Sequence, residues 1–284
     1  MRMTTCRSSR LSMLVAGAAM APALLGAQIA RPVGGAAAPA GAEAPGQRET
    51  IPHSEVRPGE YAAAPWLAAS EGPRGAGLVV GSSVVATTTS AEAVRRLQIQ
   101  ELIYVRPPAG RTLAAGDRLV TFTQGPMLPR LGQVVIPTGM LVVERAQPGQ
   151  AVEARIVAQY ESMTLGQGVL AYEAPSFPVS VRPQPVTGGL MTKVAWVEGE
   201  PVLPTLQFFV LLEAGARSGL RPGDQVTFVR ERHRTPAGDV LPETEIGVAR
   251  VVRVTPQGAT AMIIGQTQPA IGEGTVARVT ARMP

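Results

Sequence analysis

Cysteine is nearly absent from this sequence: its 284 residues include one, Cys6, in a segment that we expect to be removed. A mature chain without it has no disulfide, thiolate metal site or cysteine nucleophile. Histidine occurs twice, as His53 and His233, so a catalytic triad or a histidine metal site has few candidates. The sequence therefore predicts no catalytic, cofactor-binding or metal-binding residues, no cofactor, and a protein that is not an enzyme.

Aromatic and lysine side chains are also scarce. Phe, Trp and Tyr make up 4% of the chain, so the cores have to be built from Val, Leu, Ile and Ala. Lysine occurs once, as Lys193, and no basic run is interleaved with aromatics, which argues against nucleic-acid binding. By contrast, 31 glycines and 26 prolines disfavour long helices and favour short strands joined by tight turns.

Residues 1–27 have the pattern of a secretory signal peptide. Three arginines and no acids precede an uncharged apolar run that ends at small residues before Ala27. The run is shorter than the ~20 residues of a membrane-spanning helix and contains Pro22. We predict cleavage, export to the periplasm or outer cell envelope, and no transmembrane span afterwards. The alternative is that the segment is kept as an N-terminal anchor.

Two segments rich in proline and small residues divide the remaining chain. Residues 28–58 carry few large apolar side chains and are predicted to be a disordered Ala/Pro/Gly tether. Residues 174–187 contain four prolines and are predicted to be an extended linker. Two candidate β-modules remain, residues 59–173 and residues 188–284.

The two candidate modules repeat one another in four blocks that occur in the same order. The matching blocks begin at Glu101 and Phe208, Leu113 and Leu220, Gly139 and Gly247, and Leu165 and Ile271. Alternating apolar and polar residues within them indicate half-buried strands. We therefore predict an all-β protein of two tandem small barrels or sandwiches, related by internal duplication.

Glycines and the aspartates that follow them are predicted to form the turns of both modules. Pro222-Gly223 suits the centre of a type II turn, because proline presets the first φ and glycine accepts a positive second one. The residues assigned to structural turns are Gly116, Asp117, Gly166, Gly168, Gly223, Asp224, Gly272 and Gly274. The basic cluster from Arg230 to Arg234 precedes a Gly-Asp pair and is predicted to be a solvated hairpin tip. A helix is expected from Ser90 as its N-cap.

Some residues also permit a chemical interpretation. The pairs Glu198/Glu200 and Glu243/Glu245 could hydrolyse glycan if each pair converged and one acid were buried. We expect all four carboxylates to be solvated instead. Trp66 and Trp196 could stack on a ligand, although burial is the favoured interpretation.

The C-terminal half resembles a known family through a string of structural blocks. VEGEPVLPTLQ from Val197, LRPGDQVTFVRE from Leu220 and GVARVVRVTPQGATAMII from Gly247 are similar to the C-terminal region of bacterial proteins that contain a LysM peptidoglycan-binding domain. The segment VRPGEYAAAPWL, from Val56, is similar to the region ahead of it. The LysM module itself is absent, so its glycan-binding residues are not carried over. The strand order also resembles the C-terminal β-module of the flagellar T protein, which implies a non-catalytic assembly role.

These observations lead to one expected function and two alternatives. We expect a non-catalytic cell-envelope protein that binds or scaffolds, with peptidoglycan or an envelope protein as its partner. The first alternative is an envelope glycan hydrolase that uses a Glu pair. The second is a PDZ-like peptide binder, because GLRPGDQV resembles the turn that precedes a PDZ strand.

Overall fold

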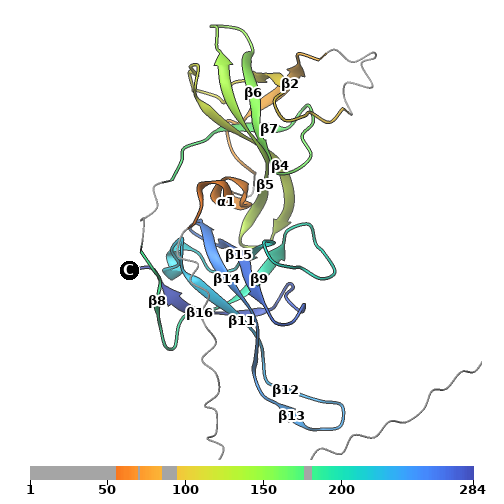
Figure 1. Cartoon of the computed structure of the whole chain (residues 1–284), viewed down its shortest axis with the longest axis vertical. Coiled ribbons are helices and arrows are strands. Elements are labelled where there is room, and N and C mark those ends of the chain that lie inside the picture. Colours follow the sequence, from red (N-terminus) through yellow and green to blue (C-terminus); the bar gives the residue numbers. More distant parts are fainter. Residues whose placement is uncertain (1–55, 70, 85–94, 176–180) are drawn as a thin grey trace, which may run out of the picture. The chain divides into compact units, whose positions relative to one another are not determined.

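The computed structural model describes residues 56–69, 71–84, 95–175 and 181–284. These residues form an all-β protein with one short helix and one 3-10 turn, which confirms the predicted class (Figure 1). The predicted leader, most of the predicted tether and His53 lie outside the described residues. No helix in the described part of the chain is long and apolar enough to cross a membrane.

The first module is a closed barrel of six antiparallel strands. Its strands are β2 (Gly77–Ser82), β3 (Leu102–Arg106), β4 (Arg118–Leu128), β5 (Gly132–Arg145), β6 (Val152–Gln159) and β7 (Gly168–Ala171). They pair in the order β5-β4-β7-β2-β3-β6, and pairing of β5 with β6 closes the barrel. A short strand, β1 (Trp66–Ala68), adds to the outer part of β5. Closure leaves no free edge among the six strands.

The second module closes in the same way. Its strands are β9 (Met191–Val197), β10 (Phe209–Leu212), β11 (Gln225–Arg230), β14 (Thr244–Val254), β15 (Ala259–Gln266) and β16 (Val276–Arg282). They pair in the order β11-β14-β15-β10-β9-β16, and β11 pairs with β16 to close the barrel. Strand β8 (Gln184–Pro185), within the predicted linker, adds to β16. A separate hairpin of β12 (His233–Arg234) and β13 (Val240–Leu241) is inserted between β11 and β14.

The internal duplication is visible in the strand order and in the backbone hydrogen bonds. The six strands of each barrel can be ranked in chain order. Strands of the same rank then have the same neighbours in both barrels. The Gly116 N–H donates to the Val143 carbonyl at 2.8 Å, and the Gly223 N–H donates to the Val251 carbonyl at 2.8 Å. Both glycines have φ of +93°. The turns at Gly116-Asp117 and Gly223-Asp224 are therefore equivalent in the two barrels.

The alignment of the last repeated block has to be corrected by two residues. The Gly166 N–H donates to Val79 at 2.9 Å and the Gly274 N–H donates to Val194 at 2.8 Å, so Gly166 is the counterpart of Gly274. Both have a positive φ, +82° and +79°. A two-residue slip preserves the in-and-out alternation of a strand, so the repeated Gly-x-Gly pattern did not reveal it.

Two of the predicted turn glycines have other roles. Gly168 is the first residue of β7, and a Cβ there would collide with the ring of Phe122. It is glycine because the ring approaches the backbone closely. Gly272 precedes the turn at Glu273-Gly274, and its N–H donates to Thr275 Oγ1 at 2.9 Å.

The helix that the structure describes begins at Pro58, whereas the expected helix begins at Ser90. Ser90 lies outside the described residues, and residues 95–98 are irregular. Helix α1 (Pro58–Ala63) instead occupies the junction between the predicted tether and the first module. Proline at its first position suits a helix start, and the Arg57 N–H donates to the Glu60 carboxylate at 3.0 Å. A six-residue helix depends on tertiary contacts, which the pattern of neighbouring residues does not reveal.

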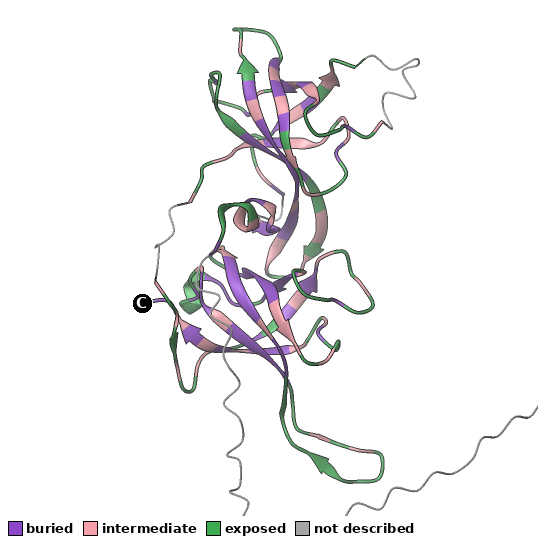
Figure 2. Ribbon diagram, in the orientation of Figure 1, coloured by how far each residue is buried: buried purple, intermediate pink, exposed green. Residues whose placement is uncertain are grey.

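Aliphatic side chains fill both barrels. In Figure 2 the buried residues are concentrated in the strands of the two barrels, whereas the β12–β13 hairpin is largely exposed. The first core is centred on Ile103, Leu119 and Leu141, and the second on Leu212, Phe228 and Ile263. The predicted dependence on Val, Leu, Ile and Ala matches these clusters.

Candidate functional site

Both tryptophans are covered by other protein groups. Trp66 is 8% exposed and Trp196 is 2% exposed. The guanidinium carbon of Arg253 lies 3.9 Å from the centroid of the Trp66 ring, and burial lowers the pKa of this arginine. The indole N–H of Trp196 donates to Glu200 at 3.4 Å. Neither ring therefore presents a face for ligand stacking, and both contribute to the cores instead.

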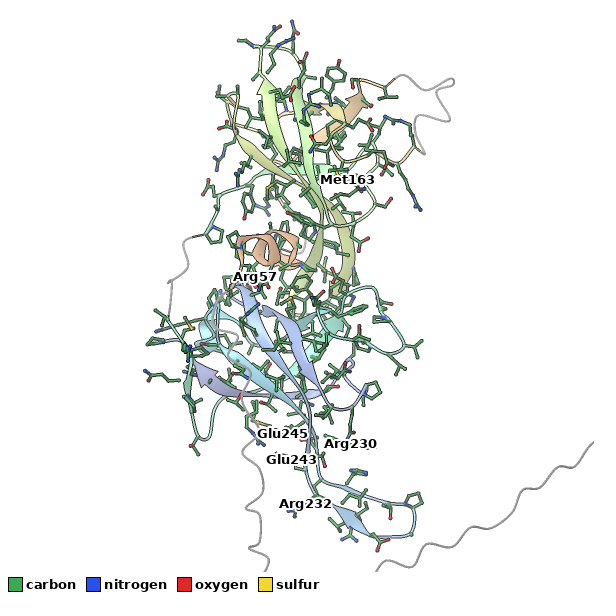
Figure 3. The ribbon with its side chains drawn as sticks, in the orientation of Figure 1. Arg57, Met163, Arg230, Arg232, Glu243 and Glu245 are labelled. Carbon is green, nitrogen blue, oxygen red and sulfur yellow. The ribbon has the colours of Figure 1, made fainter. Side chains whose placement is uncertain are left out.

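Two acids at the base of the β12–β13 hairpin converge on one arginine. Glu243 forms an ion pair with Arg278 at 2.9 Å. Glu243 and Glu245 together raise the pKa of the Arg278 guanidinium, by hydrogen bonding and by charge attraction. Figure 3 labels both residues where the hairpin leaves the second barrel. Both residues are exposed, as expected. The two acids therefore serve as counter-charges to Arg278.

The other acid pair differs from expectation. Glu198 and Gly199 form a turn after β9, so the strand alternation that would align Glu198 with Glu200 is lost. Glu200 is exposed, but Glu198 is half-buried. Burial raises the pKa of the Glu198 carboxyl to about 7, a hydrogen bond with the Phe209 backbone opposes this, and the charge of Glu161 adds to it. Glu161 follows β6 of the first barrel and has no sequence signal that connects it with Glu198.

Glu198 should make the protein less stable as the pH rises. A carboxyl whose folded pKa lies above its unfolded pKa of about 4.5 binds its proton more tightly in the folded state. The free energy of unfolding therefore falls as the pH rises above 4.5, and this fall is complete near pH 7 to 8. We expect Glu198→Gln to remove a loss on the order of 1–3 kcal/mol.

Urea unfolding of wild type and variant between pH 4.5 and pH 8 measures this difference. Glu273→Gln is the control, because Glu273 is exposed in a turn. If Glu198→Gln and wild type show the same dependence on pH, the carboxyl is not buried as described.

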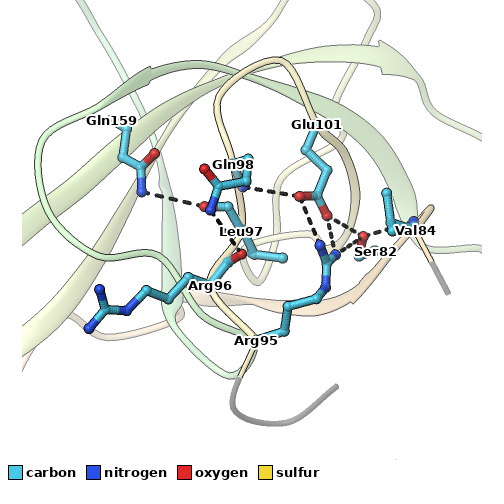
Figure 4. A network of polar contacts seen from close by, with 8 residues as sticks. All are labelled: Ser82, Val84, Arg95, Arg96, Leu97, Gln98, Glu101 and Gln159. Carbon is cyan, nitrogen blue, oxygen red and sulfur yellow. Dashed lines mark hydrogen bonds and ion pairs between the residues drawn. The ribbon is translucent and has the colours of Figure 1, made fainter. Parts of the chain in front are cut away.

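A polar cluster beside β3 anchors the segment that leads into this strand. Arg95 and Ser82 both contact the Glu101 carboxylate, and the Gln98 N–H donates to it at 3.0 Å (Figure 4). Burial raises the pKa of Glu101, but the hydrogen bonds from Arg95, Ser82 and Gln98 outweigh this effect and hold the pKa below its usual value. All polar groups of the carboxylate are engaged within the cluster, which indicates a structural role.

The remaining candidates lie in turns or in the β12–β13 hairpin. Asp239 lies in the β12–β13 turn, where its N–H donates to Thr235 Oγ1 at 3.1 Å. His233 is half-buried in β12 and lies 3.2 Å from the Glu231 carbonyl through Nδ1. Asp117 accepts the Ala114 N–H at 2.8 Å, and Asp224 accepts the equivalent Arg221 N–H at 2.9 Å.

The β12–β13 hairpin extends beyond the second barrel (Figure 1). Two ladder pairs join its strands, His233 with Leu241 and Arg234 with Val240. Val240 is 50% exposed and Leu241 is 41% exposed. Arg230 and Arg232, which Figure 3 places where the hairpin leaves the barrel, are exposed as well. The arginines of the basic cluster are exposed as expected, but the cluster lies at the base and in the first strand of the hairpin and not at its tip. The apolar pair on the opposite strand was not foreseen.

The corresponding hairpin of the first barrel is packed. Its end, between β4 and β5, carries Leu128 and Leu131, which lie against a buried cluster. That cluster contains Leu67, Val134, Trp196 and Leu211. Equivalent elements of the two modules thus differ: one is covered by protein and the other is exposed.

Comparison with known proteins adds no assignment, since no protein-family model and no curated protein sequence matches the chain. The functional interpretation therefore depends on the geometry of the chain itself.

Proposed function

We propose that this protein is a non-catalytic binding or scaffolding component of the cell envelope, associated with peptidoglycan. The observation that carries the proposal is the exposed β12–β13 hairpin of the second barrel. An isolated two-stranded hairpin is marginally stable by itself, and its unpaired edges and apolar side chains suit association with a partner. The packed β4–β5 hairpin of the first barrel is an example of such an element in contact with protein.

The envelope location is supported by sequence alone. The predicted leader implies export, and the resemblance to the C-terminal region of LysM-containing proteins favours peptidoglycan as the partner. The interiors of both closed barrels are filled by aliphatic side chains that pack against one another. Barrels filled in this way are compatible with a scaffold. The turn in GLRPGDQV occurs in both barrels, which favours a structural role over a PDZ-like one.

Sedimentation with purified peptidoglycan sacculi tests this proposal. We expect the mature protein to sediment with sacculi without releasing soluble fragments detectable by mass spectrometry. A variant with Val240→Asp and Leu241→Asp should bind about 10-fold more weakly, equivalent to ~1.4 kcal/mol. Val202→Asp is the matched control, since Val202 is 95% exposed in the β9–β10 loop. Absence of sedimentation would contradict association with peptidoglycan, and equal binding by the hairpin variant would rule out the hairpin as the contact.

A glycan hydrolase that uses Glu198 is the second candidate. It is favoured by the raised pKa of Glu198, because a general acid has to hold its proton near neutral pH. The same incubation distinguishes the two candidates: soluble fragments produced by wild type and abolished by Glu198→Gln would establish the hydrolase and overturn the scaffold.

A further inference from the structure

A cavity of about 490 Å³ lies where the turn before β11 meets the end of β16. Its volume is within the range of small-molecule sites, about 300–1,000 Å³. Leu220 and Met283 form buried apolar parts of its lining, 3% and 9% exposed, and Ala216 adds a small side chain. The charged residues of the lining are Arg221, Asp224 and Arg282.

The acid in this cavity is already satisfied by the backbone. Asp224 is fully buried, and its two carboxylate oxygens accept the Arg221 N–H at 2.9 Å and the Met283 N–H at 2.8 Å. Neither hydrogen bond involves a guanidinium. The carboxylate therefore holds the turn against the end of β16. It forms no hydrogen bond with the guanidinium group of Arg221 or Arg282, and both arginines line the cavity.

The two arginines differ in how they are engaged. Arg221 is exposed, and its Nη1 donates to the Pro284 carbonyl at 3.1 Å. Arg282 is half-buried, and an added Cβ on Gly219 would lie 3.9 Å from its Nη1. Within the described ranges, the Arg282 side chain has no hydrogen bond or ion pair. A half-buried guanidinium with its donors free can engage an anion, because these five donors are arranged for planar oxygen groups.

The first barrel shows that the turn does not need these arginines. Ala114 occupies the position of Arg221, in a turn with the same backbone hydrogen bonds and the same φ at its glycine. The residues after β7, from Tyr172 to Pro175, include no basic residue, whereas β16 ends at Arg282. Asp117 is exposed, unlike Asp224. Comparison of the two barrels therefore distinguishes the residues that form the turn from the residues that make the cavity of the second barrel basic.

We infer that this cavity binds a ligand that carries a free carboxylate next to a small aliphatic group, such as the C-terminus of an alanine peptide. Arg282 holds the carboxylate through paired N–H donors, with Arg221 as the second positive charge. Leu220, Ala216 and Met283 contact the aliphatic group. A carboxylate is favoured over a phosphate, because the lining combines one unengaged guanidinium with apolar walls. This inference does not require that the protein associates with peptidoglycan.

Titration of the mature protein with N-acetyl-alanyl-alanine, followed by NMR, tests the inference. The free acid should shift the amide resonances of Leu220 and Met283 and bind in the millimolar range or tighter, and the C-terminal amide should bind about 10-fold more weakly. Arg282→Gln should weaken binding of the free acid by a similar factor. Arg217→Gln is the control, because Arg217 is an exposed neighbour outside the lining.

Three outcomes would overturn the inference. The first is no binding of the free acid, and the second is equal binding of acid and amide. The third is that inorganic phosphate binds as tightly as the peptide and with the same dependence on Arg282, which would make the cavity a general anion site. If Arg282→Gln does not fold, Arg282→Lys retains the charge and removes the paired donors, so it should still weaken binding of the free acid.

Discussion

Glu60→Ala should destabilise the protein by about 3–5 kcal/mol, the cost of leaving a buried charge without its partner. The Glu60 carboxylate contacts Nη2 of Arg250 at 2.6 Å, with side chains 18% and 6% exposed. This ion pair joins α1 to β14 of the second barrel. Loss of the ion pair leaves the Arg250 guanidinium buried without its counter-charge. The Nε atom of Arg250 already lacks a hydrogen-bond partner among the described residues.

Urea unfolding followed by tryptophan fluorescence measures this effect. Glu71→Ala is the matched control, because Glu71 and Arg74 pair at 2.8 Å but are 74% and 80% exposed, and it should change stability by less than ~1 kcal/mol. The double variant Glu60→Gln and Arg250→Met should recover part of the loss, since it removes both charges. Equal midpoints for Glu60→Ala and wild type would show that the ion pair contributes nothing to folding.

Gly223→Val should destabilise the protein by about 2–4 kcal/mol, for two separate reasons. Its φ of +93° is strained for a β-branched residue, at a cost of about 1–2 kcal/mol. A Cβ would also lie 2.7 Å from Cγ of Met283. The variant therefore overpacks this buried contact, which should lower stability by about another 1–2 kcal/mol.

The duplication supplies the control for this prediction. Gly116 has the same φ of +93°, but a Cβ there meets nothing within 4 Å. Gly116→Val therefore reports the strain alone and should cost about half as much. In a Met283→Ala background, the effect of Gly223→Val should fall to that of Gly116→Val, as a thermal double-mutant cycle can show. Equal effects of both glycine substitutions in the native background would remove the overpacking contribution.

Several features of the protein were accessible from the residues alone. The scarcity of aromatics predicted aliphatic cores, and both barrels have them. The expectation of short strands was wrong for β4, β5 and β14, which have 11, 14 and 11 residues. The repeated Leu-x-x-Gly-Asp blocks identified the equivalent turns at Gly116 and Gly223, because glycine in that position reflects a local backbone requirement. A turn of this kind depends on a few adjacent residues, so it can be recognised from the sequence without a structure.

Other features depended on residues far apart in the chain. The register of the last repeat was decided by the bonds of Gly166 and Gly274 to β2 and β9, since a slip of two residues preserves every local pattern. Likewise, α1 is held by Arg250, about 190 positions away, and the pKa of Glu198 responds to burial and to Glu161. The basic cavity exists because β16 ends beside the turn before β11. Sequence thus determined the turns and the class of the fold, whereas burial and the charges of distant neighbours, which act through space, were decided only by the tertiary structure.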